Sequence, residues 1–177
     1  MDSTANIVEY PEGQLPDLLL PKHDQNLCYL IGKSGERPLV ALTALPAIMD
    51  KSHSCEMVNS IIKTGKKLGN DGWALFHLYP EKGELEDNIP LNEMIFEKNV
   101  RHLERFILNN EIQEIWGIWD DFTAETLEKG KIAILEMLKK HNVRIFYFGT
   151  LTQDKKPRDP LQKEEQWHMF NPNKMFL

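Results

Sequence analysis

Several features that commonly reveal a function are scarce in this sequence. It contains only two cysteines in 177 residues, Cys28 and Cys55, which is too few for a disulfide scaffold. Cys28 lies inside the apolar run Leu27–Ile31, the setting of a small buried side chain. Net charge is −6 at pH 7, so a general basic surface for duplex nucleic acid is excluded. Any nucleic-acid contact must therefore be local.

Membrane and export signals are also missing. No apolar stretch approaches the roughly 20 residues that a membrane-spanning helix needs. The first residues, Met1–Thr4, do not form a basic region followed by an apolar segment. We expect a cytoplasmic protein that makes no membrane contact.

The common catalytic motifs are absent as well. The sequence has no Gly-x-x-x-x-Gly-Lys loop, no Gly-x-Ser-x-Gly elbow, no paired Cys-x-x-Cys and no His-Glu-x-x-His. Standard hydrolase and nucleotidase mechanisms therefore lack support, and we expect no cofactor. Metal ligation by Asp50, His77 and Asp120 together has no motif spacing behind it, so no metal site is predicted.

Enough apolar sequence is present for one ordinary domain. Hydrophobic residues make up 41% of the chain and charged residues 27%, which suits a single core without disulfides. Residues 1–26 contain Pro11, Gly13, Pro16 and Pro21 and are predicted to form an irregular arm. Residues 27–177 are predicted to form a single α/β domain.

Apolar patterns predict the elements of this domain. The loop Gly32–Pro38, with two glycines and a proline, favours a hairpin between the first two apolar runs. After these two runs, segments whose apolar residues recur at helical spacing alternate with further apolar runs. Ser52 or Ser54 is available as the cap of the first helix. The predicted strands are Leu27–Ile31, Leu39–Leu45, Trp73–Tyr79, Ile112–Trp119 and Val143–Phe148, and the predicted helices are Ser54–Leu68, Asn92–Leu108 and Thr123–Lys140.

This alternation predicts a three-layer αβα fold. Its centre is a mostly parallel four-stranded sheet, and the first run adds an N-terminal hairpin strand. Ligands of such sheets bind outside the carboxyl ends of the strands. Four segments leave those ends: Pro46–Ser54, His77–Glu81, Gly117–Asp121 and Gly149–Leu161. We call the edge that they form the rim.

Two rim residues are candidates for acid–base chemistry. Asp50 is placed to orient a water or accept a proton, although an aspartate there equally suits the cap of a turn. His77 interrupts a buried strand near its end and requires a hydrogen-bond partner, which is also what a structural histidine requires.

Other rim residues are candidates for ligand binding. Trp116, beside Gly117, offers a ring on which a base can stack, or fills the core. Lys155, Lys156 and Arg158 concentrate positive charge in an acidic chain, which favours a local phosphate contact or a solvated loop.

Taken in order, the rim segments resemble a bacterial and phage family, domain of unknown function 1643, which is similar to the uracil-DNA glycosylase fold. The family motif Asn-Pro-Ser-Thr-Ala-Asp matches at Pro46 and Asp50, and Asn-Leu-Tyr-Pro matches His77–Pro80 except at the asparagine. Its Trp-Gly is present as Trp116-Gly117, and its Pro-Arg-His-Pro-Leu matches residues 157–161 except that Asp159 replaces the histidine.

The resemblance covers roughly residues 27–165 and implies the glycosylase-like fold. The departures fall on polar residues that would perform the chemistry: Leu45, Ala47 and Ile48 have apolar side chains, and an ionised Asp159 repels developing negative charge. Glycosylase activity is therefore disfavoured.

Three hypotheses for function follow. The first is a diverged glycosylase-like domain, catalytically altered or inactive, that binds a nucleotide, a nucleic acid or a protein at the rim through Pro46, Trp116, Gly117, Lys155 and Arg158. The second is an enzyme that uses Asp50 with His77 or Asp159 on a nucleobase or nucleotide. The third is a mobile-element inhibitor that contacts a protein through the arm and the apolar loop Ala47–Met49.

Overall fold

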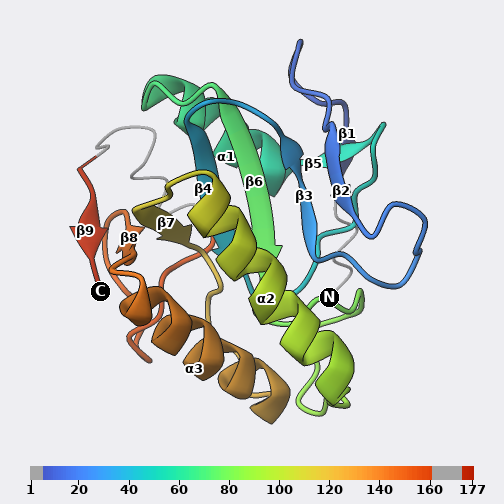
Figure 1. Ribbon diagram of the computed structural model, residues 1–177, viewed down its shortest axis with the longest axis vertical. Coiled ribbons are helices and arrows are strands. Elements are labelled where there is room, and N and C mark those ends of the chain that lie inside the picture. Colours follow the sequence, from blue (N-terminus) through green and yellow to red (C-terminus); the bar gives the residue numbers. More distant parts are fainter. Residues whose placement is uncertain (1–5, 161–172) are drawn as a thin grey trace.

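The computed structural model describes residues 6–160 and 173–177, which form a mixed α/β fold around one large sheet (Figure 1). That sheet contains seven strands in the order β2-β3-β6-β4-β7-β8-β9. The strands are β1 (Ile7–Val8), β2 (Leu18–Leu20), β3 (Leu30–Lys33), β4 (Pro38–Thr43), β5 (Ser54–Cys55), β6 (Gly72–His77), β7 (Glu114–Gly117), β8 (Arg144–Tyr147) and β9 (Met175–Phe176). The helices are α1 (Glu56–Lys67), α2 (Glu93–Asn109) and α3 (Glu125–Lys140).

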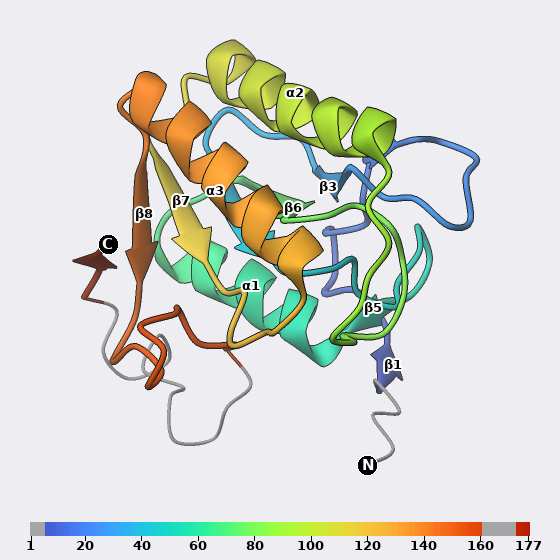
Figure 2. The ribbon, with the colours of Figure 1, turned by 90° about the horizontal axis from the view of Figure 1, so that it is seen from below.

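Helices cover both faces of the sheet and make three layers. Figure 2 shows α2 and α3 on one face and α1 on the other. Side chains of β4 alternate between the two faces, as they must in a strand. Val40 and Leu42 belong to the apolar cluster that includes residues of α2 and α3, whereas Leu39 and Ala41 belong to the cluster that includes residues of α1. The near-continuous apolar run of β4 reflects burial on both faces.

The predicted parallel sheet is confirmed at its centre. Strand β4 pairs in parallel with β6 on one side and β7 on the other, and β7 pairs in parallel with β8. These four strands are the four that the sequence predicted to be parallel. The sheet is larger than predicted because β2, β3 and β9 extend it with antiparallel pairs.

The predicted hairpin between the first two apolar runs was wrong. Strand β6 lies between β3 and β4, and the antiparallel partners of β3 are β2 and β6. The arm is also less irregular than predicted, since it supplies β2 to the sheet and β1 to a small pair with β5. Pro16 and Pro21 flank the short run of β2, and prolines in a sheet are tolerated beside an edge strand.

Helix positions agree with prediction to within two residues, but one predicted cap was wrong. The N-cap of α1 is Cys55, with no side-chain cap, because Ser54 lies in β5 and donates its hydroxyl to Asn59 Oδ1 at 2.7 Å. Gly69, at φ +82°, ends α1 as predicted. No helix within the described residues is long and apolar enough to cross a bilayer.

Candidate functional site

Two cavities open at the rim, one on each side of the segment Pro46–Asp50. The first, here called the lysine-lined cavity, has a volume of about 590 Å³ and lies between this segment and the arm. Its charged lining residues are Lys22, Asp24, Asp50, Lys51 and Lys82. The second, the acidic cavity, has a volume of about 530 Å³ and is lined by Glu56, Asp120, Asp121 and Asp159 among others.

The structure separates the three residues that were predicted to be catalytic. Asp50 and His77 line the lysine-lined cavity together with Pro46, whereas Asp159 lines the acidic cavity. Asp120 also lies on the acidic side, away from Asp50 and His77. Within residues 6–160 and 173–177, no group of three or more His, Cys, Asp or Glu side chains is placed to hold a metal ion.

Asp50 caps a turn in the loop between β4 and β5. Its Oδ1 accepts hydrogen bonds from the backbone amides of Ser52 and His53, each at 2.7 Å. These amides, followed by the neighbouring His53 ring, lower the pKa of the Asp50 carboxyl. The side chain is 64% exposed. An exposed carboxylate with a lowered pKa is a poor proton acceptor near neutral pH, so the geometry favours the capping role.

The loop that carries Asp50 is anchored from beneath by the arm. The hydroxyl of Tyr10 donates to the Asp50 carbonyl oxygen at 2.7 Å. The Tyr10 ring is buried and stacks on Trp73, with ring centroids 5.9 Å apart. One wall of the lysine-lined cavity is therefore held in place by the sheet core.

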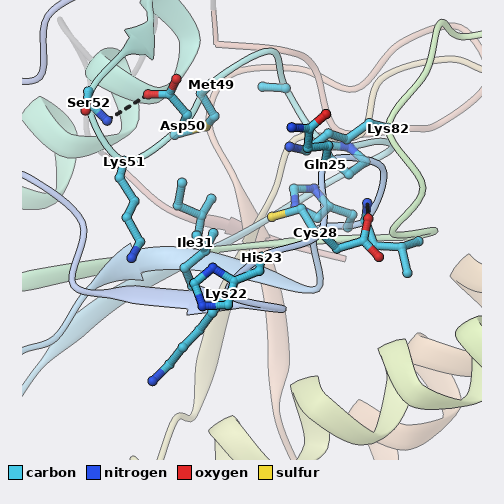
Figure 3. Close-up of a pocket in the computed structure, with 16 residues that line it drawn as sticks. Lys22, His23, Gln25, Cys28, Ile31, Met49, Asp50, Lys51, Ser52 and Lys82 are labelled. Atoms are coloured by element: carbon cyan, nitrogen blue, oxygen red, sulfur yellow. Dashed lines mark hydrogen bonds between the residues drawn. The ribbon is translucent and has the colours of Figure 1, made fainter.

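The opposite wall is held by backbone hydrogen bonds between the arm and the segment after β6. The Cys28 amide donates to the Pro80 carbonyl at 2.9 Å, and the Lys82 amide donates to the Asn26 carbonyl at 2.7 Å. This pairing places Lys82 beside Gln25 (Figure 3). It brings together residues that are more than fifty positions apart in the sequence.

His77 lies buried at the end of β6, in the wall of the same cavity. The residue is 1% exposed, and its Nδ1 lies 2.9 Å from the Thr43 hydroxyl oxygen on β4. Asn99 of α2 donates its Nδ2 to the His77 carbonyl oxygen at 2.7 Å, which fixes the end of the strand. Burial, followed by the charge of Lys82, lowers the pKa of His77 to about 3, so the ring is neutral.

The hydrogen bonds of Thr43 determine which nitrogen of His77 carries the proton. The Thr43 hydroxyl lies 2.9 Å from the Leu45 carbonyl oxygen, which can only accept, so its single proton points there. Thr43 must then accept from His77, and Nδ1 is the protonated nitrogen. Nε2 is left as a bare acceptor, and it has no partner within the described part of the chain. Leaving such an acceptor unpaired costs about 1–3 kcal/mol.

Three lysines contribute positive charge around this cavity. Lys22, Lys51 and Lys82 are exposed, and none forms an ion pair with another described residue. In Figure 3, Lys51 lies on one side of the cavity and Lys82 on the other, with Cys28 and Ile31 between them. Lys22 points away from the other two lysines in that view.

The two aspartates of the cavity are occupied by backbone amides. Asp24 Oδ1 accepts from the amides of Asn26 and Leu27 at 2.7 and 3.1 Å, much as Asp50 accepts from its own loop. Backbone amides therefore engage Oδ1 of each carboxylate, and among the described residues neither carboxylate forms an ion pair with Lys22, Lys51 or Lys82.

The floor of the cavity is apolar. Leu19, Leu27, Ile31 and Met49 line it. Cys28 also lines it, and burial raises the pKa of its thiol to about 11. The thiol is therefore protonated near neutral pH and is no nucleophile.

Trp116 and Gly117, both predicted to bind a ligand, are parts of the core. The Trp116 ring is 2% exposed and packs on Phe146 and Phe148, with centroids 6.4 and 5.2 Å away. It presents no open face on which a base can stack. A Cβ on Gly117 would lie 2.9 Å from Ile145 and 3.0 Å from Pro157, so close packing accounts for this glycine.

The basic loop near residues 155–158 uses most of its positive charge internally. Lys156 Nζ donates to the Phe122 carbonyl at 3.1 Å and lies 3.7 Å from the centroid of the Phe122 ring. Arg158 donates to the carbonyls of Thr150 and Leu151. Of the three predicted phosphate contacts, Lys156 and Arg158 are half-buried and Lys155 is exposed, with a positive φ of 62°. Leu161, predicted to end this loop, lies outside the described residues.

The prediction missed Lys22, Gln25 and Lys82. Lys22 and Gln25 belong to the arm, which the prolines made look structureless, and Lys82 follows a strand without any motif. Their proximity depends on the hydrogen bonds between the arm and residues 80–82, which no local pattern indicates. Lys51 alone carried a signal, because it follows Asp50 in a predicted rim loop.

Comparisons of the chain with protein-family models, with curated proteins and with solved structures gave no match. The resemblance to the glycosylase-like family therefore stays a prediction.

Proposed function

We propose that the chain binds a mononucleotide in the lysine-lined cavity. The observation that carries this proposal is that Lys51 and Lys82 line one cavity from opposite sides (Figure 3), while backbone amides bond to Oδ1 of each of its two aspartates. A phosphate group is a ligand that suits lysine ammonium groups without an ion-pair partner among the described residues. The apolar floor suits the flat face of a base, and the volume of about 590 Å³ lies in the range of small-molecule sites.

A single nucleotide fits the electrostatics better than a long nucleic acid does. The chain carries a net charge of −6, and the positive side chains of this site are confined to one cavity. A polyanion extending beyond the cavity would meet the acidic remainder of the surface.

Within the two hypotheses based on the rim, binding is better supported than catalysis. Asp50 was the proposed catalytic group, but it is held as a cap with a lowered pKa. Asp159, its proposed partner, lines the other cavity. The proposal is therefore a binding protein whose glycosylase-like ancestry, taken from the sequence resemblance, is a hypothesis.

The test is calorimetric titration of the protein with guanosine and uridine 5′-monophosphates, ribose 5-phosphate and inorganic phosphate. We expect Lys51→Ala/Lys82→Ala to weaken binding of each phosphorylated ligand at least tenfold, since each charge-assisted bond contributes about 1.5–3 kcal/mol. Lys98→Ala/Lys139→Ala is the matched control, because it removes the same charge from exposed sites on α2 and α3. Equal weakening in both double variants, or no binding by the wild type, contradicts the proposal.

A second candidate, contact with a protein partner, is favoured by one observation. Ile48 is 64% exposed and Ile7 is 60% exposed, and both line a small hollow beside Met49. Such a patch was expected if the arm and the loop Ala47–Met49 formed a contact surface. The test compares how tightly a partner protein binds three forms of the chain. It should bind the wild type and Lys51→Ala/Lys82→Ala equally tightly, and it should not bind Ile7→Ser/Ile48→Ser. Retention by the isoleucine variant would remove this candidate.

A further inference from the structure

We propose that His77 sets the specificity of the lysine-lined cavity, by accepting a hydrogen bond at Nε2 from a ring N–H group of the bound base. The inference rests on the proposed function and adds the class of base. It selects nucleotides with an oxo base, whose ring carries an N–H beside a carbonyl, such as uracil and guanine.

The protonation of His77 is imposed by the fold. Thr43 gives its only proton to the Leu45 carbonyl, so it can only accept from Nδ1. The ring is buried and neutral, and Nε2 is therefore an acceptor that cannot become a donor without breaking the Thr43 contacts. A site of this kind discriminates between ligands that present a donor and ligands that do not.

His77 also lacks an alternative partner. Its Nε2 is buried and accepts no hydrogen bond from any residue within the described chain. Asn99 holds the carbonyl of His77 from the other face of the sheet, and the contact of Nδ1 with the Thr43 hydroxyl holds the ring. A donor delivered by a ligand would relieve this unsatisfied acceptor.

The ligand must open a path to reach Nε2, because this atom is buried. Met49 and Gln25 also line the cavity, and their unbranched side chains can change rotamer at low cost. Because Lys51 and Lys82 are exposed and His77 is buried in the wall, the proposal places the phosphate at the lysines and the base edge at His77. This orientation makes the base edge the part of the ligand that is read.

The experiment compares nucleotide pairs that differ only at the ring nitrogen. Guanosine 5′-monophosphate is titrated beside its N1-methyl derivative, and uridine 5′-monophosphate beside its N3-methyl derivative. The wild type is expected to bind at least one parent nucleotide about tenfold more tightly than its methylated form, because methylation removes the donor. Ribose 5-phosphate, which has no base, serves as the probe of the phosphate contacts alone.

Two variants separate the acceptor from the fold. His77→Gln places a side-chain oxygen near the position of Nε2, whereas His77→Asn keeps only a polar atom near Nδ1. We expect His77→Gln to retain most of the tenfold preference and His77→Asn to lose it, with the affinity for ribose 5-phosphate unchanged in both. A purely structural histidine would instead weaken all ligands together in both variants, which overturns the proposal.

The possible failures are distinguishable. If ribose 5-phosphate binds and Lys51→Ala/Lys82→Ala abolishes its binding, yet the wild type does not discriminate either methylated pair, the role of His77 is refuted and the proposed function stands. If no phosphorylated ligand binds the wild type, the proposed function fails and the specificity proposal fails with it. Tighter binding of a single-stranded oligonucleotide than of any mononucleotide overturns the mononucleotide class.

Discussion

Two groups of basic side chains lie near the rim, and their surroundings differ. Lys155, Lys156 and Arg158 are adjacent in the sequence, but Lys156 and Arg158 donate to carbonyl groups of their own neighbourhood. Lys51 and Lys82 are far apart in the sequence, yet they line one cavity and form no ion pair with a described residue. Clustering of charge along this chain therefore does not indicate which basic side chains line the lysine-lined cavity.

The reason is the cost of leaving backbone carbonyls without donors. Residues 150–160 form a loop with little regular structure, so its carbonyls need donors from side chains. Nearby lysine and arginine side chains provide them. At the lysine-lined cavity the carbonyls of Pro80, Asn26 and His53 accept from backbone amides, and no ammonium group of its three lysines donates to a carbonyl of the described residues.

The largest expected effect concerns His77, whose buried ring lies in the wall of the lysine-lined cavity. Burial lowers the pKa of His77 to about 3 from its ordinary value of 6.5, so between these values the unfolded chain holds a proton that the folded chain does not. Stability should therefore fall as the pH falls below 6.5, and His77 should contribute about 2 kcal/mol of loss between about pH 7 and about pH 5.

Urea denaturation at the two pH values measures this loss. The control is His77→Gln, which keeps every other titrating group. Its loss of stability between the two pH values should be smaller than that of the wild type by about 2 kcal/mol. The same loss in both proteins would mean that the His77 ring is not held neutral by burial.

The next effect tests whether the basic loop is part of the folded core. Gly117→Ala places a methyl group against Ile145, Trp119 and Pro157, the last of which belongs to the loop. Overpacking of this kind should lower the free energy of unfolding by about 1–2 kcal/mol. Nucleotide affinity should not change, because Gly117 does not line the lysine-lined cavity. A change in affinity without a change in stability would restore Gly117 to the binding site.

A smaller effect distinguishes two neighbouring lysines of the loop. Lys156→Ala removes a hydrogen bond to the Phe122 carbonyl and a cation–π contact, and should cost about 1 kcal/mol of stability. Lys155→Ala should cost almost nothing, since its side chain is exposed. Thermal denaturation of both variants measures the difference, and equal melting temperatures would refute the internal role of Lys156.

The smallest effect is a gain in affinity. Asp24→Asn and Asp50→Asn keep an oxygen acceptor for the capped turns but remove two negative charges from the cavity. The double variant should bind ribose 5-phosphate a few-fold more tightly, in line with roughly 0.5–1 kcal/mol for exposed charges. Loss of binding would instead return Asp50 to a direct role in the function.

Much of the fold could be predicted from the sequence. The spacing of apolar residues and the length of each apolar run indicate which residues are buried, and therefore which segments form strands and helices. The run Leu39–Leu45 indicated a strand covered on both faces, and β4 is such a strand. Pairing partners could not be predicted in the same way. The glycines and proline of residues 32–38 suit a tight hairpin as well as a crossover, and the choice between them depends on where β6 inserts.

The candidate site was only partly predictable. The rim rule located Pro46, Asp50 and His77 on one cavity, because the ends of parallel strands meet at one edge. It could not locate Lys22, which follows strand β2 and its pairing with β3, or Lys82, whose amide donates to the Asn26 carbonyl. It also could not tell that Trp116 faces the core, since alternate residues of a strand buried on both faces are equally apolar.

The most direct test of the central comparison reverses charge in each basic group. Guanosine 5′-monophosphate, uridine 5′-monophosphate and ribose 5-phosphate are titrated calorimetrically into Lys51→Glu/Lys82→Glu and into Lys155→Glu, with folding checked by circular dichroism. The account predicts a loss of about a hundredfold in the first variant, as expected for two charge-assisted contacts, and a change of less than about twofold in the second. A larger loss in Lys155→Glu than in the cavity variant would contradict it and place phosphate binding on the loop.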